Sequence, residues 1–206
     1  MSKTKKATKF VEDMVTNSIV SKYGDVIRSG TEVLNNINSL SVIGLSPALD
    51  IALGGGLREG SVVVMTGDPK SGKTTTALHF ASKCQQLNKK VIYINTEGRM
   101  YEQNITGIKN LDADKMLIVE STDDRVLTAE DFLNIIENYI NNDPGCLIIV
   151  DSLSNMVPAQ ELEGEVRTGV RNALPRLLSM FFKRISGTLM KNKTILLCIT
   201  HNIANT

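Results

Sequence analysis

Five short apolar segments limit most strongly what this chain can fold into. They occupy residues 61–66, 91–95, 116–120, 146–150 and 194–200. Each is an almost continuous apolar string without period-two alternation, which is typical of parallel strands covered on both faces. Patterns with helical spacing lie between them, above all a capping box at 128–131 and a leucine and phenylalanine stripe over 174–189. The sequence therefore predicts an α/β fold with a mostly parallel central sheet.

Length and composition agree with a globular protein. The chain has 206 residues, of which 42% are hydrophobic and 22% charged, so we expect one main domain with a sizeable core. No apolar run approaches the roughly 20 residues that span a bilayer, so no membrane partner is expected. The three cysteines, Cys84, Cys146 and Cys198, lie in apolar stretches. This pattern predicts reduced core thiols in a cytoplasmic protein.

The N-terminal segment is predicted to be a separate part. Residues 7–22 carry apolar side chains on one helical face, and a polar connector follows. A lone amphipathic helix of this length is marginal in water, so its apolar face needs a partner, either the main body or a neighbouring subunit. We therefore expect a small helical segment and linker over 1–40 and the main body over 41–206.

Polar or ionisable residues follow each apolar segment. In open parallel sheets, ligands bind beyond the carboxyl ends of the strands. We therefore expect these residues to meet at one edge and to form a site. In chain order they are Gly67 to Thr74, Thr96-Glu97, Ser121-Thr122, Asp151-Ser152 and His201-Asn202.

The first of these groups, GDPKSGKT, fits the P-loop or Walker A pattern G-x-x-x-x-G-K-[ST]. Gly67 and Gly72 permit a backbone that turns N–H groups toward an anion. Lys73 adds a charge for the β- and γ-phosphates, and Thr74 offers a hydroxyl to Mg²⁺. A chance match is the alternative, but the preceding strand and following helix favour ATP and Mg²⁺ as ligands. The expected nucleotide contacts are Gly67, Asp68, Pro69, Lys70, Ser71, Gly72, Lys73, Thr74, Thr75, Asp151 and Ser152.

Three further residues are candidates for the chemistry of ATP hydrolysis. Asp151 ends a buried strand and is expected to reach Mg²⁺ through water; alone, such an aspartate is more often a turn former or helix cap. Glu97 is a candidate general base for the attacking water, with a solvated loop carboxylate as the alternative. His201 is a candidate sensor of the γ-phosphate, with a half-exposed strand-end imidazole as the alternative.

Charge is distributed unevenly along the chain. The formal net charge is only +1, but residues 1–28 carry +3 and residues 160–206 carry +4, balanced by −6 between them. The near-neutral total therefore does not exclude a nucleic-acid partner.

Arg176, Ser179 and Lys183 share a helix face opposite the apolar stripe, and the loop before them adds Arg167 and Arg171. This set suits contact with DNA phosphates, although an ordinary solvated polar face is an equal alternative.

These residues resemble the RecA recombinase family, including phage-encoded members of the UvsX type. The similarity covers about residues 19–206 and is carried by LSPALDIALGGGL, GDPKSGKTT, YINTEG, LIIVDSLSNMVPAQELEGE and TILLCITHN. It implies an ATPase that binds single-stranded DNA, forms a helical homo-oligomeric filament and exchanges strands with duplex DNA, in the host cytoplasm for a phage protein. It also implies that the N-terminal helix docks on the adjacent subunit and that residues from about 164 to 175 form the first DNA-binding loop.

The sequence departs from the family pattern at three places. The sensor position holds His201 where bacterial members usually have glutamine, and the shorter segment after Glu97 does not identify Tyr101 as an adenine contact. The sequence ends five residues after His201, so we expect an ATPase core that is incomplete at its C-terminus. A ring-forming ATPase or helicase on the same fold and a non-catalytic nucleotide-binding fragment remain alternatives. Electron micrographs would separate the recombinase, which forms open filaments on DNA, from the ring-forming ATPase, which forms closed rings.

Overall fold

The computed structural model describes residues 14–24, 26–162 and 173–201. The chain divides into two units, Met1–Ser41 and Val42–Thr206. The first unit contains helices α1 (Met14–Tyr23) and α2 (Gly30–Asn38). The second contains the sheet predicted from the apolar segments, and the site described below lies within it.

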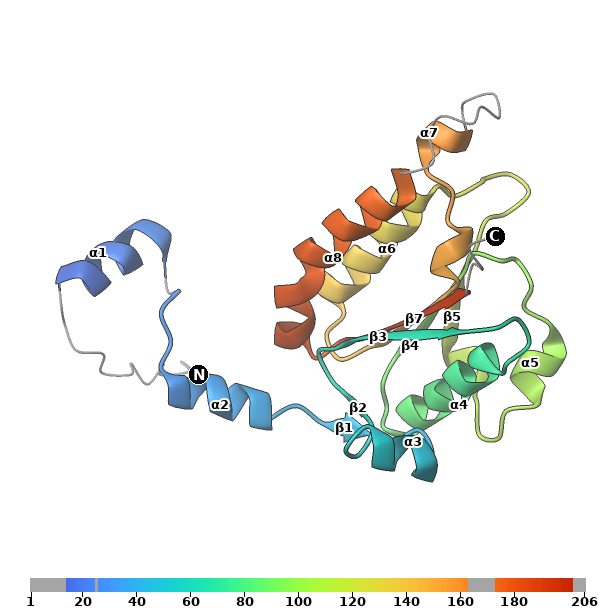
Figure 1. Ribbon diagram of the computed structural model, residues 1–206, viewed down its shortest axis with the longest axis horizontal. Coiled ribbons are helices and arrows are strands. Elements are labelled where there is room, and N and C mark those ends of the chain that lie inside the picture. Colours follow the sequence, from blue (N-terminus) through green and yellow to red (C-terminus); the bar gives the residue numbers. More distant parts are fainter. Residues whose placement is uncertain (1–13, 25, 163–172, 202–206) are drawn as a thin grey trace. The chain divides into compact units, whose positions relative to one another are not determined.

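The second unit is built on a five-stranded, all-parallel sheet (Figure 1). Its strands are β3 (Val62–Gly67), β4 (Val91–Asn95), β5 (Met116–Val119), β6 (Leu147–Asp151) and β7 (Ile195–His201). They are hydrogen-bonded in the order β3-β7-β6-β4-β5. The predicted α/β class and parallel sheet are confirmed, and each strand begins and ends within one residue of its apolar segment.

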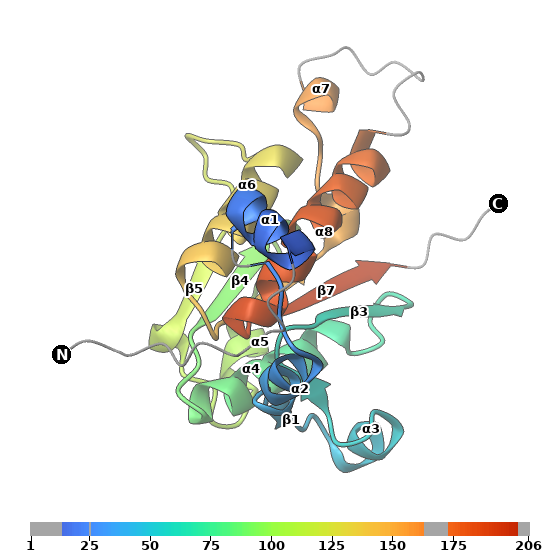
Figure 2. The ribbon, with the colours of Figure 1, turned by 90° about the vertical axis from the view of Figure 1, so that its left-hand side faces the viewer.

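Helices cover both faces of this sheet. Helix α4 (Lys73–Gln86) packs on one face, and α6 (Ala129–Asn142) and α8 (Ala173–Asn192) pack together on the other (Figures 1 and 2). Alternate residues of each central strand enter the two cores, so Leu147 and Ile149 of β6 face α4 while Ile148 and Val150 face α6 and α8. This explains the continuous apolar strings, because both faces of a central strand are buried.

The predicted helix signals are also confirmed. The Thr128 side chain accepts from the N–H of Asp131, and the Asp131 carboxylate accepts from the N–H of Thr128, as a capping box requires. In α8 the apolar stripe packs into the core, with Phe181, Ile185 and Leu189 buried. The polar faces of α6 and α8 are joined at the surface by an ion pair between Glu137 and Arg184.

The two edge strands differ from the expectation of burial on both faces. In β3 the outward positions alternate with the covered ones, and the side chains of Val62 and Val64 are 39% and 55% exposed. In β5, Leu117 and Ile118 are about as exposed as Val62. An apolar string therefore identified the strands correctly but did not reveal which of them lie at the edges of the described sheet.

The predicted N-terminal connector contains a helix that the sequence patterns did not indicate. Helix α2 occupies its centre, with the Ser29 side chain accepting from the N–H of Glu32 as an N-cap. Helix α1 ends at Tyr23 as expected, and residues 7–13 of the predicted helix lie outside the described residues.

Shorter elements complete the second unit. A two-stranded antiparallel ribbon and several short helices lie around the main sheet. They are β1 (Val42–Ile43), α3 (Pro47–Ala52), β2 (Leu57–Arg58), α5 (Glu102–Thr106) and α7 (Ala159–Leu162), with 3-10 turns at Ala113–Lys115 and Leu153–Asn155. All three cysteines are buried with free thiols, as expected for core residues. Within the described ranges, no helix is both long and apolar enough to cross a bilayer.

Candidate nucleotide site

A polar cavity of about 560 Å³ lies at the carboxyl edge of the sheet. Its volume falls within the range of small-molecule sites, about 300 to 1,000 Å³. The loop and helix start after β3 form one wall, and residues that end or follow β4, β6 and β7 form the others. The lining residues are Pro69, Lys70, Ser71, Gly72, Lys73, Thr74, Thr75, Glu97, Arg99, Asn104, Asp151, Asn155 and His201.

The loop between β3 and α4 closes around the Lys73 side chain. The Lys73 ammonium donates to the carbonyl oxygens of Gly67 and Asp68, at 2.9 and 2.8 Å. Gly72 precedes the helix with a left-handed φ of +89°, a conformation that glycine adopts without steric cost. Hydrogen bonding within the helix begins at Thr76, whose N–H donates to the Gly72 carbonyl. The N–H groups of Lys73, Thr74 and Thr75 have no helical partner, so the start of the helix can offer them to an anion.

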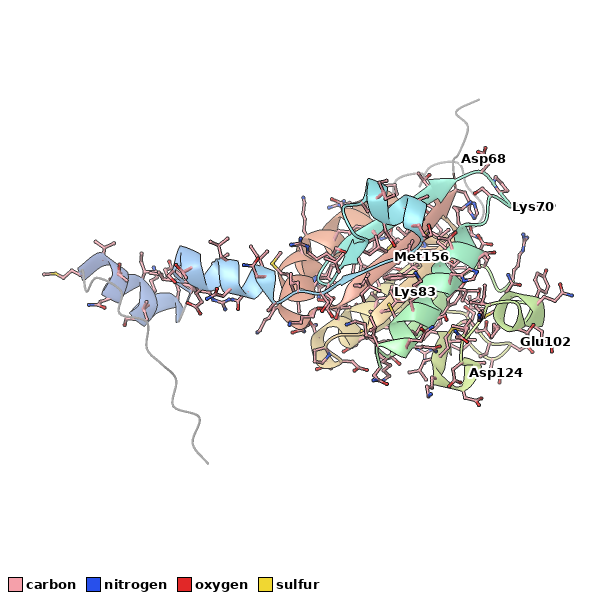
Figure 3. The ribbon with its side chains drawn as sticks, turned by 90° about the horizontal axis from the view of Figure 1, so that it is seen from below. Asp68, Lys70, Lys83, Glu102, Asp124 and Met156 are labelled. Carbon is pink, nitrogen blue, oxygen red and sulfur yellow. The ribbon has the colours of Figure 1, made fainter. Side chains whose placement is uncertain are left out.

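The exposed turn of this loop carries one acidic and one basic side chain. Asp68 and Lys70 lie at the outer end of β3, where Figure 3 labels them, and both are exposed. Lys70 lines the cavity, whereas Asp68 contributes its backbone carbonyl to Lys73. The loop therefore places its two cations at the cavity.

The carboxylate of Asp151 is held by two hydroxyl groups. Thr74 Oγ1 and Tyr93 Oη donate to the same oxygen, Asp151 Oδ2, at 2.6 and 2.7 Å. Asp151 is only 6% exposed although it lines the cavity. Burial raises the pKa of the Tyr93 phenol, and the neighbouring negative charge of Asp151 raises it further. Tyr93 therefore remains a protonated donor, and the arrangement joins the phosphate loop to the end of β6.

Glu97 and His201 form the second polar contact at the cavity. Nε2 of His201 lies 2.7 Å from Glu97 Oε1, and the Ser152 hydroxyl donates to the same oxygen at 3.2 Å. The other ring nitrogen, His201 Nδ1, is buried and has no hydrogen-bond partner among the described residues. A proton on Nδ1 would be buried without an acceptor, so the geometry favours the tautomer in which Nε2–H donates to Glu97.

Backbone and side-chain hydrogen bonds fix the position of Glu97 relative to Asp151. The neighbouring residue Thr96 donates its N–H to the Asp151 carbonyl at 3.0 Å and its hydroxyl to the Ser152 carbonyl at 2.7 Å. Ser152 returns its N–H to the Thr96 hydroxyl at 2.8 Å. The ends of β4 and β6 are thereby locked together, so Glu97 and Asp151 share one rigid support.

The donor set fits a nucleotide with a divalent cation. Among the described lining residues, the cations are Lys70, Lys73 and Arg99, and the anions are Glu97 and Asp151. The cations lie on the side of the phosphate loop and of the segment after Glu97, which suits a polyphosphate. The hydroxyl of Thr74 and the carboxylate of Asp151 are oxygen ligands of the kind that Mg²⁺ prefers, directly or through water.

Most of the residues predicted for the site line this cavity, but six described ones do not: Gly67, Asp68, Thr96, Ser121, Thr122 and Ser152. Asn202 lies outside the described residues. Ser121 and Thr122 are absent from the lining, because β5 lies at the far edge of the sheet from β3. The Ser121 hydroxyl instead accepts from the N–H of Leu127. Gly67 and Ser152 lie behind the lining, where they bind Lys73 and Glu97 respectively.

Sequence reasoning missed several residues of the site. Arg99, Asn104 and Asn155 line the cavity, and Tyr93 supports Asp151 from the core. Tyr101 does not line it and is 65% exposed. A signal existed for Tyr93 alone, since it is a hydroxyl-bearing residue in the middle of an otherwise apolar central strand.

The residues proposed for DNA contact are described only in part. Arg176, Ser179 and Lys183 are exposed on α8, and neither cation forms an ion pair with a described residue. Arg167 and Arg171 lie outside the described residues, as do residues 164–172 of the expected loop. Residues 173–175, which were expected to end this loop, belong to the first turn of α8.

Comparison with known proteins identifies the family. The RecA N-terminal domain family model matches residues 9–204. The chain belongs to this family. It is 33% identical over 177 residues to "Protein RecA" of Latilactobacillus sakei, covering 85% of this chain and 48% of that protein. It is 34% identical over 177 residues to "Protein RecA" of Clostridium botulinum strain Alaska E43, with the same coverage of 85% and 48%.

A more distant relative extends the RecA-family match slightly. "Protein RecA" of Rippkaea orientalis is 27% identical over 186 residues, covering 89% of this chain and 51% of that protein. The chain thus spans about half the length of the curated relatives that it matches. The RecA-type fold is established by the family match and the parallel sheet together.

Proposed function

We propose that this chain is the nucleotide-binding part of a RecA-type recombinase, which binds ATP with Mg²⁺ and hydrolyses ATP when bound to single-stranded DNA. The observation that supports this most directly is that Lys73, Thr74, Glu97 and Asp151 meet at one cavity. The same proposal includes filament formation and strand exchange with duplex DNA. We propose that the protein acts in the cytoplasm.

Phosphate binding falls to the loop after β3. In the proposed complex the Lys73 ammonium, held near Gly67 and Asp68, turns toward the β- and γ-phosphate oxygens. The N–H groups at the start of α4 and the positive end of its dipole add to this attraction. Thr74 Oγ1, and Asp151 through a water molecule, would hold Mg²⁺, which neutralises charge on the phosphate oxygens when bound.

Hydrolysis requires a water molecule to attack the γ-phosphorus as the bond to the β-phosphate oxygen breaks. In this proposal the Glu97 carboxylate orients that water and accepts its proton, which later passes to solvent. Glu97 Oε1 is already occupied by His201 and Ser152, so Oε2 is the oxygen left for water. A γ-phosphate oxygen is a competing acceptor for the Nε2–H of His201, which links the nucleotide to the end of β7.

DNA binding is assigned to the polar face of α8. Arg176 and Lys183 are exposed cations without an ion pair among the described residues, and Ser179 lies between them at helical spacing. Unpaired cations are free to replace the counterions of a phosphate backbone, which makes binding weaker as salt rises. Arg167 and Arg171, on the segment before α8, would add to this surface.

The decisive test compares Lys73→Ala and Glu97→Gln with the unaltered protein. We expect Lys73→Ala to abolish binding of a fluorescent ATP analogue. Glu97→Gln should bind it normally but hydrolyse ATP at least about 100-fold more slowly, because a positioned general base contributes that much or more. Glu102→Gln, an exposed carboxylate on α5, is the matched control and should have no effect. Undiminished DNA-stimulated hydrolysis in Lys73→Ala would contradict the assignment.

A second test addresses the DNA surface. Binding of a labelled single-stranded oligonucleotide is followed by fluorescence anisotropy at several salt concentrations. Arg176→Ala and Lys183→Ala should each weaken binding and reduce the slope of log K against log salt by about 0.7. Lys191→Ala is the control, because this exposed residue lies on α8 about 22 Å from Arg176 at 1.5 Å per residue. Unchanged slopes for the first two variants would make this an ordinary solvated face.

A further inference from the structure

Tyr93 carries a hydroxyl group where packing alone does not need one. It is the middle residue of β4, it is 2% exposed, and it belongs to the core between the sheet and α4. The neighbouring strand positions that face the same core are Val91, Leu147 and Ile149. A phenylalanine would fill this space without bringing a polar atom into it, and a buried hydroxyl without a partner is costly. The hydroxyl of Tyr93 is therefore explained by what it binds.

Its partner is the cation-binding carboxylate of the proposed site. Tyr93 Oη donates to Asp151 Oδ2 at 2.7 Å, and Thr74 Oγ1 donates to the same oxygen at 2.6 Å. No described residue hydrogen-bonds the other oxygen, Oδ1. Two donors on one oxygen fix the rotation of the carboxylate about its χ2 angle, which is otherwise loosely restrained. The consequence is an oriented carboxylate with Oδ1 left free at the cavity.

The two donors differ in what else they can do. Thr74 lies in the first turn of α4 and, in the proposed function, also offers its oxygen to Mg²⁺, so its geometry changes when the nucleotide binds. Tyr93 is held by the packing of its ring, and among the described residues its hydroxyl binds only Asp151. Burial is the main cause that raises the pKa of its phenol above the usual value.

We propose that Tyr93 is a positioning residue for the divalent cation: its hydroxyl fixes the Asp151 carboxylate so that Oδ1 meets the cation-bound water. This inference rests on the proposed nucleotide function of the site. The core of the sheet, and not only the loops, then helps to set the affinity for Mg²⁺. Residues that orient a metal ligand typically change metal affinity about 10- to 100-fold when replaced.

The test uses Tyr93→Phe, which removes one oxygen atom and keeps the ring. The readout is the Mg²⁺ concentration that gives half-maximal binding of a fluorescent ATP analogue, together with its affinity in the presence of a chelator. We expect the Mg²⁺ midpoint to rise about tenfold, with the chelator value unchanged within about twofold. Tyr139→Phe is the control, because Tyr139 is a half-buried tyrosine on α6 that packs outside the site, and its midpoint should not move.

A double-mutant cycle separates positioning from general destabilisation. Asp151→Asn should raise the Mg²⁺ midpoint by itself, and adding Tyr93→Phe to it should cause little further change if the hydroxyl acts through the carboxylate. Independent, multiplicative effects would overturn the proposal. So would a Tyr93→Phe midpoint equal to that of the unaltered protein. If the unaltered protein shows no Mg²⁺-dependent nucleotide binding at all, it is the proposed function that fails.

A second measurement keeps the test valid if Tyr93→Phe does not fold. The chain contains four tyrosines, so 3-fluorotyrosine labelling gives four ¹⁹F signals. Replacing Tyr23, Tyr101 and Tyr139 in turn assigns the signal of Tyr93 by elimination. With nucleotide present, Mg²⁺ titration should shift this signal with the midpoint of nucleotide binding. A Tyr93 signal that does not respond to Mg²⁺ would refute the proposal.

Discussion

Replacing Gly72 by alanine tests whether the phosphate loop is shaped for an anion or only for the fold. Gly72 has a φ of +89°, and a Cβ atom added there would meet no protein atom within 4 Å. The stability cost therefore comes from the left-handed backbone alone, about 1 to 2 kcal/mol. Gly54 offers a matched control, with a φ of +68° and equally open surroundings in the same unit, but no place in the cavity.

Nucleotide binding should distinguish the two variants. A left-handed alanine at position 72 relaxes by rotating the loop backbone, which misaligns the N–H groups ahead of α4. Each hydrogen bond lost to a charged phosphate oxygen costs about 1.5 to 3 kcal/mol, or about 10- to 150-fold in Kd. Urea unfolding should show equal losses for Gly72→Ala and Gly54→Ala, while a fluorescent ATP analogue should bind more weakly only to Gly72→Ala. Equal affinity for the two variants would refute the reasoning.

Two further predictions concern stability and reactivity. Thr128→Ala should lower the free energy of unfolding in urea by about 1 kcal/mol at pH 7, because it removes an N-cap. Hydrogen bonds from Thr128 hold the pKa of Asp131 below its usual value. The carboxylate's contribution to folding stability is therefore complete above about pH 4 and is lost as the pH falls through the lowered pKa. The effect of Thr128→Ala should shrink at pH 3, and an undiminished effect there would contradict the assigned capping box. Burial raises the pKa of the Cys84 thiol to about 12, so mass spectrometry should find it unmodified by iodoacetamide at pH 8 in the native protein and modified in urea.

The strands and the long helices could be predicted because local patterns determine them. The central strands are buried on both faces and read as uninterrupted apolar strings, and the capping box fixes the start of α6. Helix α2 was missed because its segment begins with Gly30 and contains several asparagines, residues that are more common in turns than in helix interiors. Val33, Leu34 and Ile37 do lie at helical spacing, but three apolar residues among polar ones are also compatible with a linker.

The site could be predicted only where a motif fixes both residue type and position. Lys73, Thr74 and Asp151 follow from the phosphate-loop pattern and the end of an apolar strand. Ser121 was misplaced because the sequence does not give the order of strands in the sheet, and β5 lies at the far edge. Arg99 reaches the cavity through the path of an irregular segment, which no local pattern specifies.

The strand order also means that the two sides of the cavity are attached to strands with different numbers of neighbours. The phosphate loop follows β3, which pairs with β7 alone in the described sheet. Asp151 ends β6, which is flanked by β7 and β4. Backbone amides of an outer strand open locally at a lower free-energy cost than those of a central one. A ligand that contacts both Lys73 and Asp151 would link β3, which opens more readily, to β6, which opens less readily. Deuterium uptake in β3 should therefore slow on nucleotide binding far more than uptake in β6.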